Sequence, residues 1–192
     1  MAFETCSKEG EAIQYGAGTL VFLAKLLLSE PQNMLASSSG YVGGWENYQL
    51  ANYLQGRVYN GINEEYKRLL KLAKVPTTAR DSNGTIVVNN ANSYLFLPAF
   101  AEVNSEQVTS SEWQNPQPYL AEAAETSNLD NFTMPTYWPC ATPDGVVRKY
   151  WLRSTTGWSA SNFYAVNPDQ TISYSSGSSN KPDVYVRFMF TI

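Results

Sequence analysis

The chain closes on a run, Val184–Ile192, in which apolar side chains occupy every second position. Val, Val, Phe, Phe and Ile fall on one face of this run, and Tyr, Arg, Met and Thr fall on the other. A period of two is typical of a half-buried strand, because successive side chains of a strand point to opposite faces. We therefore predict that the chain ends in a strand whose even-numbered residues face a hydrophobic core.

The C-terminal segment 150–192 begins with a second strand-like stretch, Tyr150–Ser154, and continues into polar residues. Residues 155–183 are mainly Ser, Thr, Asn, Gly and Asp, with aromatic side chains set among them. Rigid aromatic rings and adaptable polar groups are typical of recognition loops held by a scaffold. The alternative is a solvated loop that Trp158 and Phe163 pin to the domain. The predicted ligand contacts are Thr156, Trp158, Ser161, Asn162, Tyr164, Tyr174, Ser176 and Asn180.

Composition argues against several classes of protein. The length of 192 residues predicts one domain, residues 1–192, with its own core. The chain has 13 Tyr and 5 Trp but no His, so it lacks the commonest general base and metal ligand. Its net charge of −4 provides no basic footprint for nucleic acid or an anionic membrane. The acids Glu102, Glu122, Glu125 and Asp144 are scattered, so a hydrolase with paired carboxylates is disfavoured and a non-enzymatic protein without a cofactor is predicted.

Two short amphipathic helices are predicted in the first half of the chain. The first covers residues 45–55, where apolar residues recur every three positions, and Gly56 is expected to end it. Asn63 is expected to cap the second helix, because its side chain can accept a hydrogen bond from the first turn. The stripe of the second helix that should be buried is Ile62, Tyr66, Leu69, Leu70 and Ala73.

Beyond Pro76 the pattern changes to short strands. Asn83-Gly84 predicts a tight turn before a β-branched strand over residues 85–88, and residues 94–97 form another short strand. Residues 104–148 are polar and interrupted by Pro, which predicts a loop-rich insertion. Helices early in the chain and strands later indicate an α+β fold with two short helices, several short antiparallel strands and long loops.

The chain shows no recognisable export signal or membrane span. The apolar run Thr19–Leu28 is too short to cross a bilayer, and Lys25 interrupts it. Glu4, Glu9 and Glu11 precede the run, where a secretory signal would carry positive charge. Three locations fit: the cytoplasm, a virus particle, or a trimmed piece of an exported protein.

Several short motifs occur in an order that resembles an uncharacterised domain family of gut bacteria and their phages. The hallmark of that family is a Tyr-Trp-Leu-Arg-Ser stretch, a polar loop segment and a closing Gly-Val-Arg-Pro-like strand. Tyr185 and Phe188 replace the Gly and the Pro of that pattern. The resemblance covers about residues 22–192. Its motifs are Phe22–Lys25, Gly43–Trp45, Tyr53–Gly56, Tyr94–Leu97, Glu102-Val103, Tyr150–Ser154 and Val186–Phe188.

The resemblance implies a C-type-lectin-like fold, in the branch that holds formylglycine-generating enzymes and the variable proteins of diversity-generating retroelements. It implies a binding module whose C-terminal segment contacts a carbohydrate or protein on a host cell. The module itself would be located on a virion or a cell surface. Such a module would be a phage receptor-binding or diversified variable protein. The alternative is a structural or decoration component of a phage particle or surface assembly, as a homo-oligomer or part of a larger virion assembly. The paired Cys of the enzymes is absent, because Cys140 stands alone in that part of the chain.

Three smaller features have structural interpretations. Cys6 and Cys140 either pair or remain free buried thiols, and the second interpretation is favoured. Asn167-Pro168-Asp169 is similar to a calcium-holding triplet of C-type lectins, but Asn-Pro is also ordinary turn chemistry, so we predict a hairpin turn and no metal site. We expect Arg153 and Arg187 to have structural roles, paired with an acid such as Asp183 or with backbone carbonyls. We expect Trp45 and Trp151 to lie in the core.

Overall fold

The computed structural model describes residues 13–14, 21–37, 43–81, 83, 85–100, 140–156, 159, 161–179 and 181–192. Its helical elements are the 3-10 turn η1 (Trp45–Asn47), α1 (Gln49–Tyr53), the π-helical turn η2 (Leu54–Val58) and α2 (Glu64–Lys67). Its strands are β1 (Ile13–Gln14), β2 (Val21–Leu23), β3 (Ala73–Arg80), β4 (Ile86–Ser93), β5 (Leu95–Phe96), β6 (Tyr150–Thr155), β7 (Asn162–Val166), β8 (Ile172–Ser176) and β9 (Met189–Thr191).

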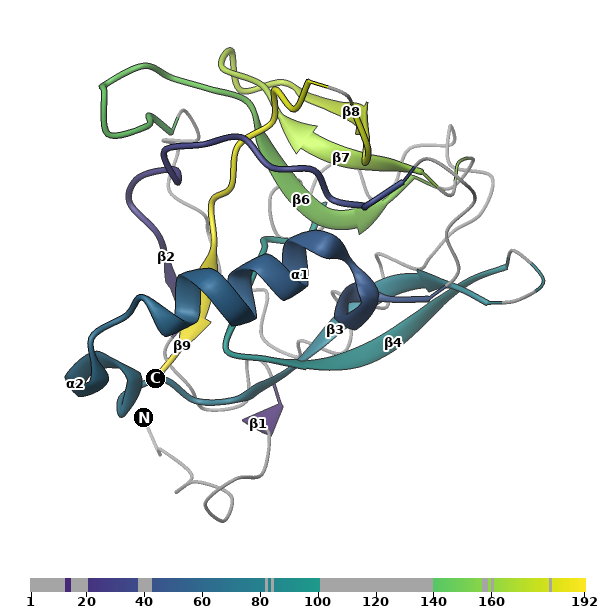
Figure 1. The fold of residues 1–192 in the computed structure, drawn as a ribbon. Coiled ribbons are helices and arrows are strands. Elements are labelled where there is room, and N and C mark those ends of the chain that lie inside the picture. The colour runs from purple at the N-terminus through teal and green to yellow at the C-terminus, as the bar shows by residue number, and fades with distance from the viewer. Residues whose placement is uncertain are drawn as a thin grey trace.

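The described strands form three three-stranded sheets, ordered β1-β3-β4, β2-β9-β5 and β6-β7-β8 (Figure 1). All the pairings within them are antiparallel except that of β1 with β3. The pairing of β2 with β9 joins an early segment of the chain to its last residues, with Val21 opposite Thr191. Few short helices and several short antiparallel sheets confirm the predicted α+β class.

The first predicted helix exists, but the prediction that Gly56 ends it is wrong. The 3-10 turn η1 ends at the extended residue Tyr48, and helical backbone then runs from Gln49 through η2, which contains Gly56, to Asn60. The predicted cap of the next helix is confirmed, because the Asn63 side chain accepts a hydrogen bond from the Glu65 N–H at 2.9 Å. Within the described ranges, no helix has the length and apolar character needed to cross a membrane.

The apolar stripe of the second helix is mostly not buried. Helix α2 is a single turn, and Ala73 belongs to β3, where it is fully buried. Tyr66 and Leu69 are 65 % and 56 % exposed. Helix α2 lies at the periphery of the domain (Figure 1), which explains why much of its apolar stripe is exposed.

The closing run does not form one regular strand. Val184 and Val186 are buried as predicted, but the ladder of β9 covers only Met189–Thr191. There Met189 and Thr191 are fully buried, whereas the intervening Phe190 is partly exposed. Irregular backbone between Val186 and β9 therefore shifts the phase of burial by one residue, which exchanges the two faces of a strand. The prediction that the even-numbered residues face the core holds at the start of the run and is wrong at its end.

The strands predicted in the middle of the chain are confirmed and extended. The strand expected over 85–88 lies in β4, and the one over 94–97 contains β5. The turn before β4 is closed by Asp81, whose carboxylate accepts hydrogen bonds from the N–H groups of Asn83 (2.9 Å) and Thr85 (2.8 Å). Most of the predicted insertion 104–148 lies outside the described residues, which resume at Cys140.

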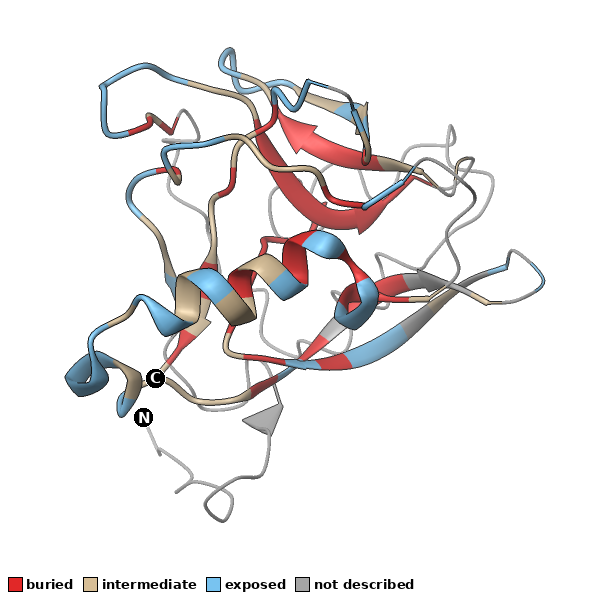
Figure 2. Cartoon of the chain, viewed as in Figure 1, coloured by how far each residue is buried: buried red, intermediate tan, exposed pale blue. Residues whose placement is uncertain are grey.

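Two hydrophobic clusters pack against opposite faces of β6 and β7, whereas β8 lies largely outside them. Trp151 and Phe163 face the larger cluster, which also holds Trp45. Tyr150 and Tyr164 face the smaller one. Because both faces are covered, every residue of β6 is buried, and Figure 2 shows β6 and β7 almost wholly in the buried colour. The core positions predicted for Trp45 and Trp151 are confirmed.

The two framework arginines have structural roles, as predicted. Arg153 is fully buried, and its Nη1 donates a hydrogen bond to the carbonyl of Leu97 at 2.7 Å. The Nε of Arg187 donates to the carbonyl of Ala24 at 3.0 Å, and its guanidinium lies 5.6 Å from the ring centre of Tyr150. Both side chains therefore connect segments that are distant in sequence.

Cys140 is a free, buried thiol in the smaller cluster. Its Sγ donates a hydrogen bond to the carbonyl of Lys25 at 3.2 Å. Burial raises the pKa of this thiol above its ordinary value, so it stays protonated and poorly reactive at neutral pH. Cys6 lies outside the described residues.

Candidate functional site

The polar part of the C-terminal segment is organised around a hairpin of β7 and β8. Its turn is closed by hydrogen bonds from the Asn167 N–H to the Thr171 carbonyl (2.8 Å) and from the Gln170 N–H to the Asn167 carbonyl (3.0 Å). Gln170 has a positive φ of 71°. The hairpin turn predicted at Asn167-Pro168-Asp169 is confirmed.

The carboxylate of Asp169 takes part in closing this turn. Its Oδ1 accepts hydrogen bonds from the hydroxyl of Thr171 at 2.6 Å and from the Thr171 N–H at 3.1 Å. These two bonds hold the pKa of Asp169 below its ordinary value. Over the ranges that the structure covers, no group of three or more His, Cys, Asp or Glu residues could hold a metal ion.

The register of the hairpin brings four of the predicted contact residues together. Asn162 lies opposite Ser176, and Tyr164 lies opposite Tyr174. Because alternate residues of a strand point to the same side, all four belong to one face of the hairpin. We call Asn162, Tyr164, Tyr174 and Ser176 the hairpin face.

The strand order decides which residues of the hairpin face reach solvent. β7 is the central strand of its sheet and β8 is an edge strand. Tyr174 on β8 is accordingly 55 % exposed, whereas Tyr164 on β7 is 4 % exposed. Figure 2 shows β7 mainly in the buried colour and β8 mainly in the colours of intermediate and exposed residues. Ser176 is exposed and Asn162 is partly exposed. The prediction of Tyr164 as a surface contact is corrected, because its ring packs 4.4 Å from the ring of Phe100 in the smaller cluster, which covers this part of the face.

Two further predicted contacts adjoin the Asn162 end of the face. Thr156 is fully buried, and its N–H donates to the Asn162 carbonyl at 3.0 Å. It therefore positions β7 rather than meeting a ligand, which corrects its predicted role. Ser161 is partly exposed, and its carbonyl accepts a hydrogen bond from the Gly177 N–H at 2.6 Å. The remaining predicted contacts, Trp158 and Asn180, lie outside the described residues.

Residues from an early segment hold the end of β8, and the sequence gives no sign of them. The Asn33 side chain donates to the Ser179 carbonyl (2.9 Å) and accepts from the Ser179 N–H (3.1 Å). The Leu35 N–H donates to the Gly177 carbonyl at 2.8 Å. Asn33 and Ser179 are separated by 146 positions, so no local pattern could have revealed this contact.

The opposite side of β8 is also fixed. Lys149 donates a hydrogen bond from Nζ to the Ser175 hydroxyl at 2.6 Å. Burial lowers the pKa of this lysine, although Asp183 opposes the shift. The edge strand is therefore attached to the domain on the side away from the hairpin face.

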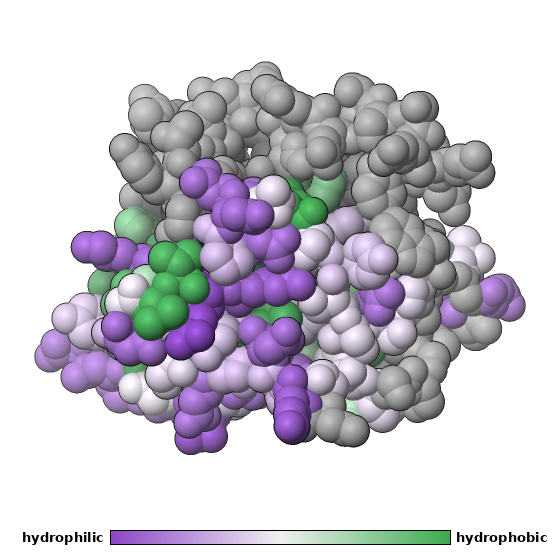
Figure 3. Space-filling view, turned by 90° about the horizontal axis from the view of Figure 1, so that it is seen from above, coloured by the Kyte–Doolittle hydropathy of each residue, from purple (hydrophilic) through white to green (hydrophobic). Residues whose placement is uncertain are grey.

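The exposed groups of the hairpin face can form two kinds of contact. The ring of Tyr174 offers a flat apolar surface with a polar tip, and Asn162 and Ser176 offer an amide and a hydroxyl. Viewed from above in the orientation of Figure 1, the end of the domain that carries β8 is largely hydrophilic among the coloured residues, with small hydrophobic patches (Figure 3). The arrangement suits a polar ligand that also presents an apolar patch, such as a sugar or a protein loop.

Comparison with known proteins identifies the family of the chain. No curated protein and no solved structure matches it significantly. Residues 18–192 match the family described as "Domain of unknown function (DUF6273)", and this match covers nearly the whole chain. The chain therefore belongs to the DUF6273 family.

Proposed function

We propose that this chain is a non-enzymatic recognition module that binds a carbohydrate or protein on a host-cell surface through the hairpin face. The observation that carries the proposal is the row of exposed Tyr174 and Ser176 with the partly exposed Asn162, on a hairpin that hydrogen bonds attach to Asn33 and Lys149. Exposed aromatic and polar side chains on a rigid frame lose little conformational entropy when a ligand binds.

The proposal includes a C-type-lectin-like fold and a place on a virion or cell surface, as a phage receptor-binding or diversified variable protein. Three features support this fold. The helices precede most of the strands, β2 pairs with β9 near the two ends of the domain, and a long stretch of chain separates β5 from β6. The segment after β6 then carries the ligand contacts, as the resemblance of the sequence implies.

The direct test is binding of the purified chain to a glycan array and to host cells, with a Tyr174→Ala variant beside it. Tyr174 is the largest exposed side chain of the hairpin face, so its loss should weaken binding about tenfold or more. The fold should be preserved, because β8 is an edge strand and Tyr174 is more than half exposed.

A matched control is Tyr66→Ala, which removes an exposed tyrosine at the α2 end of the domain. This variant should bind as the parent chain does. Equal loss of binding in the two variants, or no binding by the parent chain, would contradict recognition through the hairpin face. The second outcome would favour a structural component of a larger assembly.

A further inference from the structure

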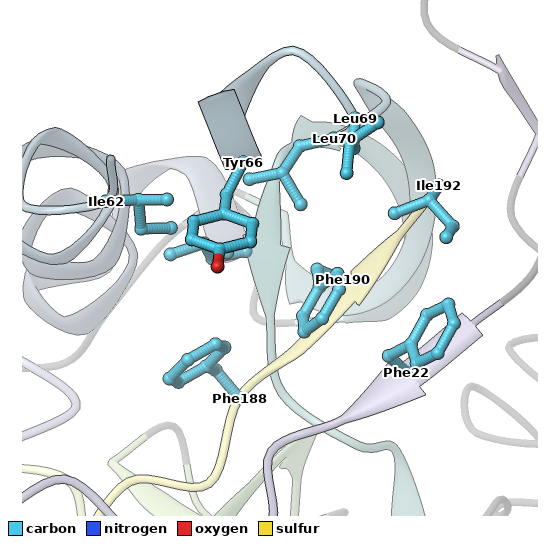
Figure 4. A pocket seen from close by; sticks show the side chains of 9 residues that line it. Phe22, Ile62, Tyr66, Leu69, Leu70, Phe188, Phe190 and Ile192 are labelled. Carbon is cyan, nitrogen blue, oxygen red and sulfur yellow. The ribbon is translucent and has the colours of Figure 1, made fainter. Parts of the chain in front are cut away.

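A pocket of about 300 Å³ lies between α2 and the end of β9 (Figure 4). Figure 1 shows α2 and β9 away from β7 and β8, the strands that carry the hairpin face. Side chains from β2, β5, α2 and β9, and from residues just before and after α2 and β9, surround it. The position of the pocket explains why the apolar stripe of α2 is exposed: Tyr66 and Leu69 form part of its wall. The lining residues are Phe22, Ile62, Tyr66, Leu69, Leu70, Leu95, Phe188, Phe190 and Ile192.

Four of the nine residues that line the pocket are aromatic. Phe22 and Phe190 stack with ring centres 5.3 Å apart, and Phe188 lies 6.4 Å from Phe190 at a tilt of 39°. Phe188 and Phe190 also pack against the larger hydrophobic cluster, so one side of the pocket is continuous with the core. In Figure 4 these rings and Tyr66 surround the same space from different elements. Aromatic rings pack favourably in stacked or edge-to-face arrangements, so these walls suit an aromatic guest.

The chemistry of the lining limits the charge of any occupant. The hydroxyl of Tyr66 is the only polar side-chain group among the lining residues. On α2, Lys67 is paired with Glu64 at 2.8 Å, and neither side chain lines the pocket. A charged group placed inside would lose its hydration without gaining a counter-charge, which is strongly unfavourable.

We propose that this pocket binds a neutral aromatic small molecule of one or two rings. Its size lies at the lower end of the range for ligand sites, about 300–1,000 Å³, and a dry apolar cavity of about 150 Å³ accepts a single benzene ring. This site is separate from the hairpin face and does not depend on the function proposed for that face.

The test uses the neutral two-ring fluorescent probe prodan, a dialkylaminonaphthyl ketone, with the full chain. The probe should bind saturably with one site per chain, and indole should displace it. Leu69→Asp should weaken binding about tenfold or more, because it places a carboxylate in the apolar wall. Leu69 is 56 % exposed and lies outside both buried clusters, so the variant should fold.

The matched control is Leu26→Asp, which adds the same charge at a leucine that is 47 % exposed and does not line the pocket. It should bind the probe like the parent chain. Absence of saturable binding, or equal affinities for the two variants, would overturn the proposal. Light scattering of the parent chain and of Leu69→Asp shows whether a second copy of the chain fills the pocket instead. A parent chain that is a dimer and a Leu69→Asp variant that is a monomer would also overturn the proposal. Since Tyr174 is unchanged in both variants, failure here leaves the test of the hairpin face unaffected.

Discussion

Replacing Trp151 with alanine is expected to reduce the free energy of unfolding by about 3–5 kcal/mol, enough to unfold most of the chain at moderate temperature. Trp151 is 1 % exposed and packs edge-on to Phe163 with ring centres 6.3 Å apart. Its Nε1 donates a hydrogen bond to the Gln32 carbonyl at 2.7 Å. The substitution removes the ring that joins β6 to an early segment, and it leaves a cavity. Urea unfolding followed by circular dichroism measures the effect.

Trp151→Phe separates the packing from the hydrogen bond. This variant keeps an aromatic ring but loses the donor to Gln32, so its loss of stability should be clearly smaller than that of Trp151→Ala. If both variants unfold at the same urea concentration as the parent chain, Trp151 does not occupy the core position described above.

Gly177→Ala is expected to destabilise the chain by about 1–3 kcal/mol, because the added methyl group has no space. A Cβ at this position would lie 2.6 Å and 2.8 Å from two ring atoms of Phe163 and 3.1 Å from Leu35. Phe163 is fully buried between β6 and β8, so its ring cannot move away without disturbing the core. Gly177 directly follows β8, and the strain should therefore also displace Ser176 on the hairpin face. Urea unfolding of the purified variant measures the loss.

Gly56→Ala provides the matched control. Gly56 lies in the helical segment η2, and a Cβ there would meet no atom within 4 Å. Alanine favours helical backbone over glycine by about 1 kcal/mol, so this variant should be slightly more stable than the parent chain. A Gly177→Ala variant as stable as Gly56→Ala would contradict the close packing of Phe163 against the end of β8.

Local chemistry was predictable from the sequence. The Asn63 cap and the Asn167-Pro168-Asp169 turn each depend on a side chain bonding to backbone only a few residues away. The strand at Tyr150–Ser154 was also predictable, because it opens with three aromatic or apolar residues in succession, which is typical of a strand buried on both faces. The α+β class followed from the order of these elements.

Strand order was not predictable, and it determines which candidate contacts reach solvent. Tyr164 and Tyr174 are cross-strand partners of the same residue type on the same face, yet one is buried and the other exposed. Periodicity shows which side chains share a face, but it does not show that β7 is central and β8 lies at the edge. Periodicity has the same limit for the apolar stripe of α2. The spacing predicts that these side chains share one face of the helix, but it does not predict whether another part of the domain covers that face.

The phase change before β9 has a different cause. The regular alternation of Val184–Ile192 predicts one continuous strand. In the structure, the residues between Val186 and Met189 belong to no strand, so the alternation is interrupted there. Tertiary packing overrides the local pattern there, since Met189 joins the larger cluster while Phe188 and Phe190 line the apolar pocket.

The most direct test of the central claim, recognition through the hairpin face, is host-cell binding by a chain that carries a bulky label at Ser176. Ser176→Cys, in a Cys6→Ser background, provides an exposed thiol, while Cys140 is buried and protonated. Asn60→Cys provides an exposed thiol at the end of the helical segment that begins at Gln49, and it serves as the control. A polyethylene-glycol maleimide at position 176 should reduce binding about tenfold or more, and the same label at position 60 should leave it unchanged. Equal binding by the two labelled chains would contradict recognition through the hairpin face.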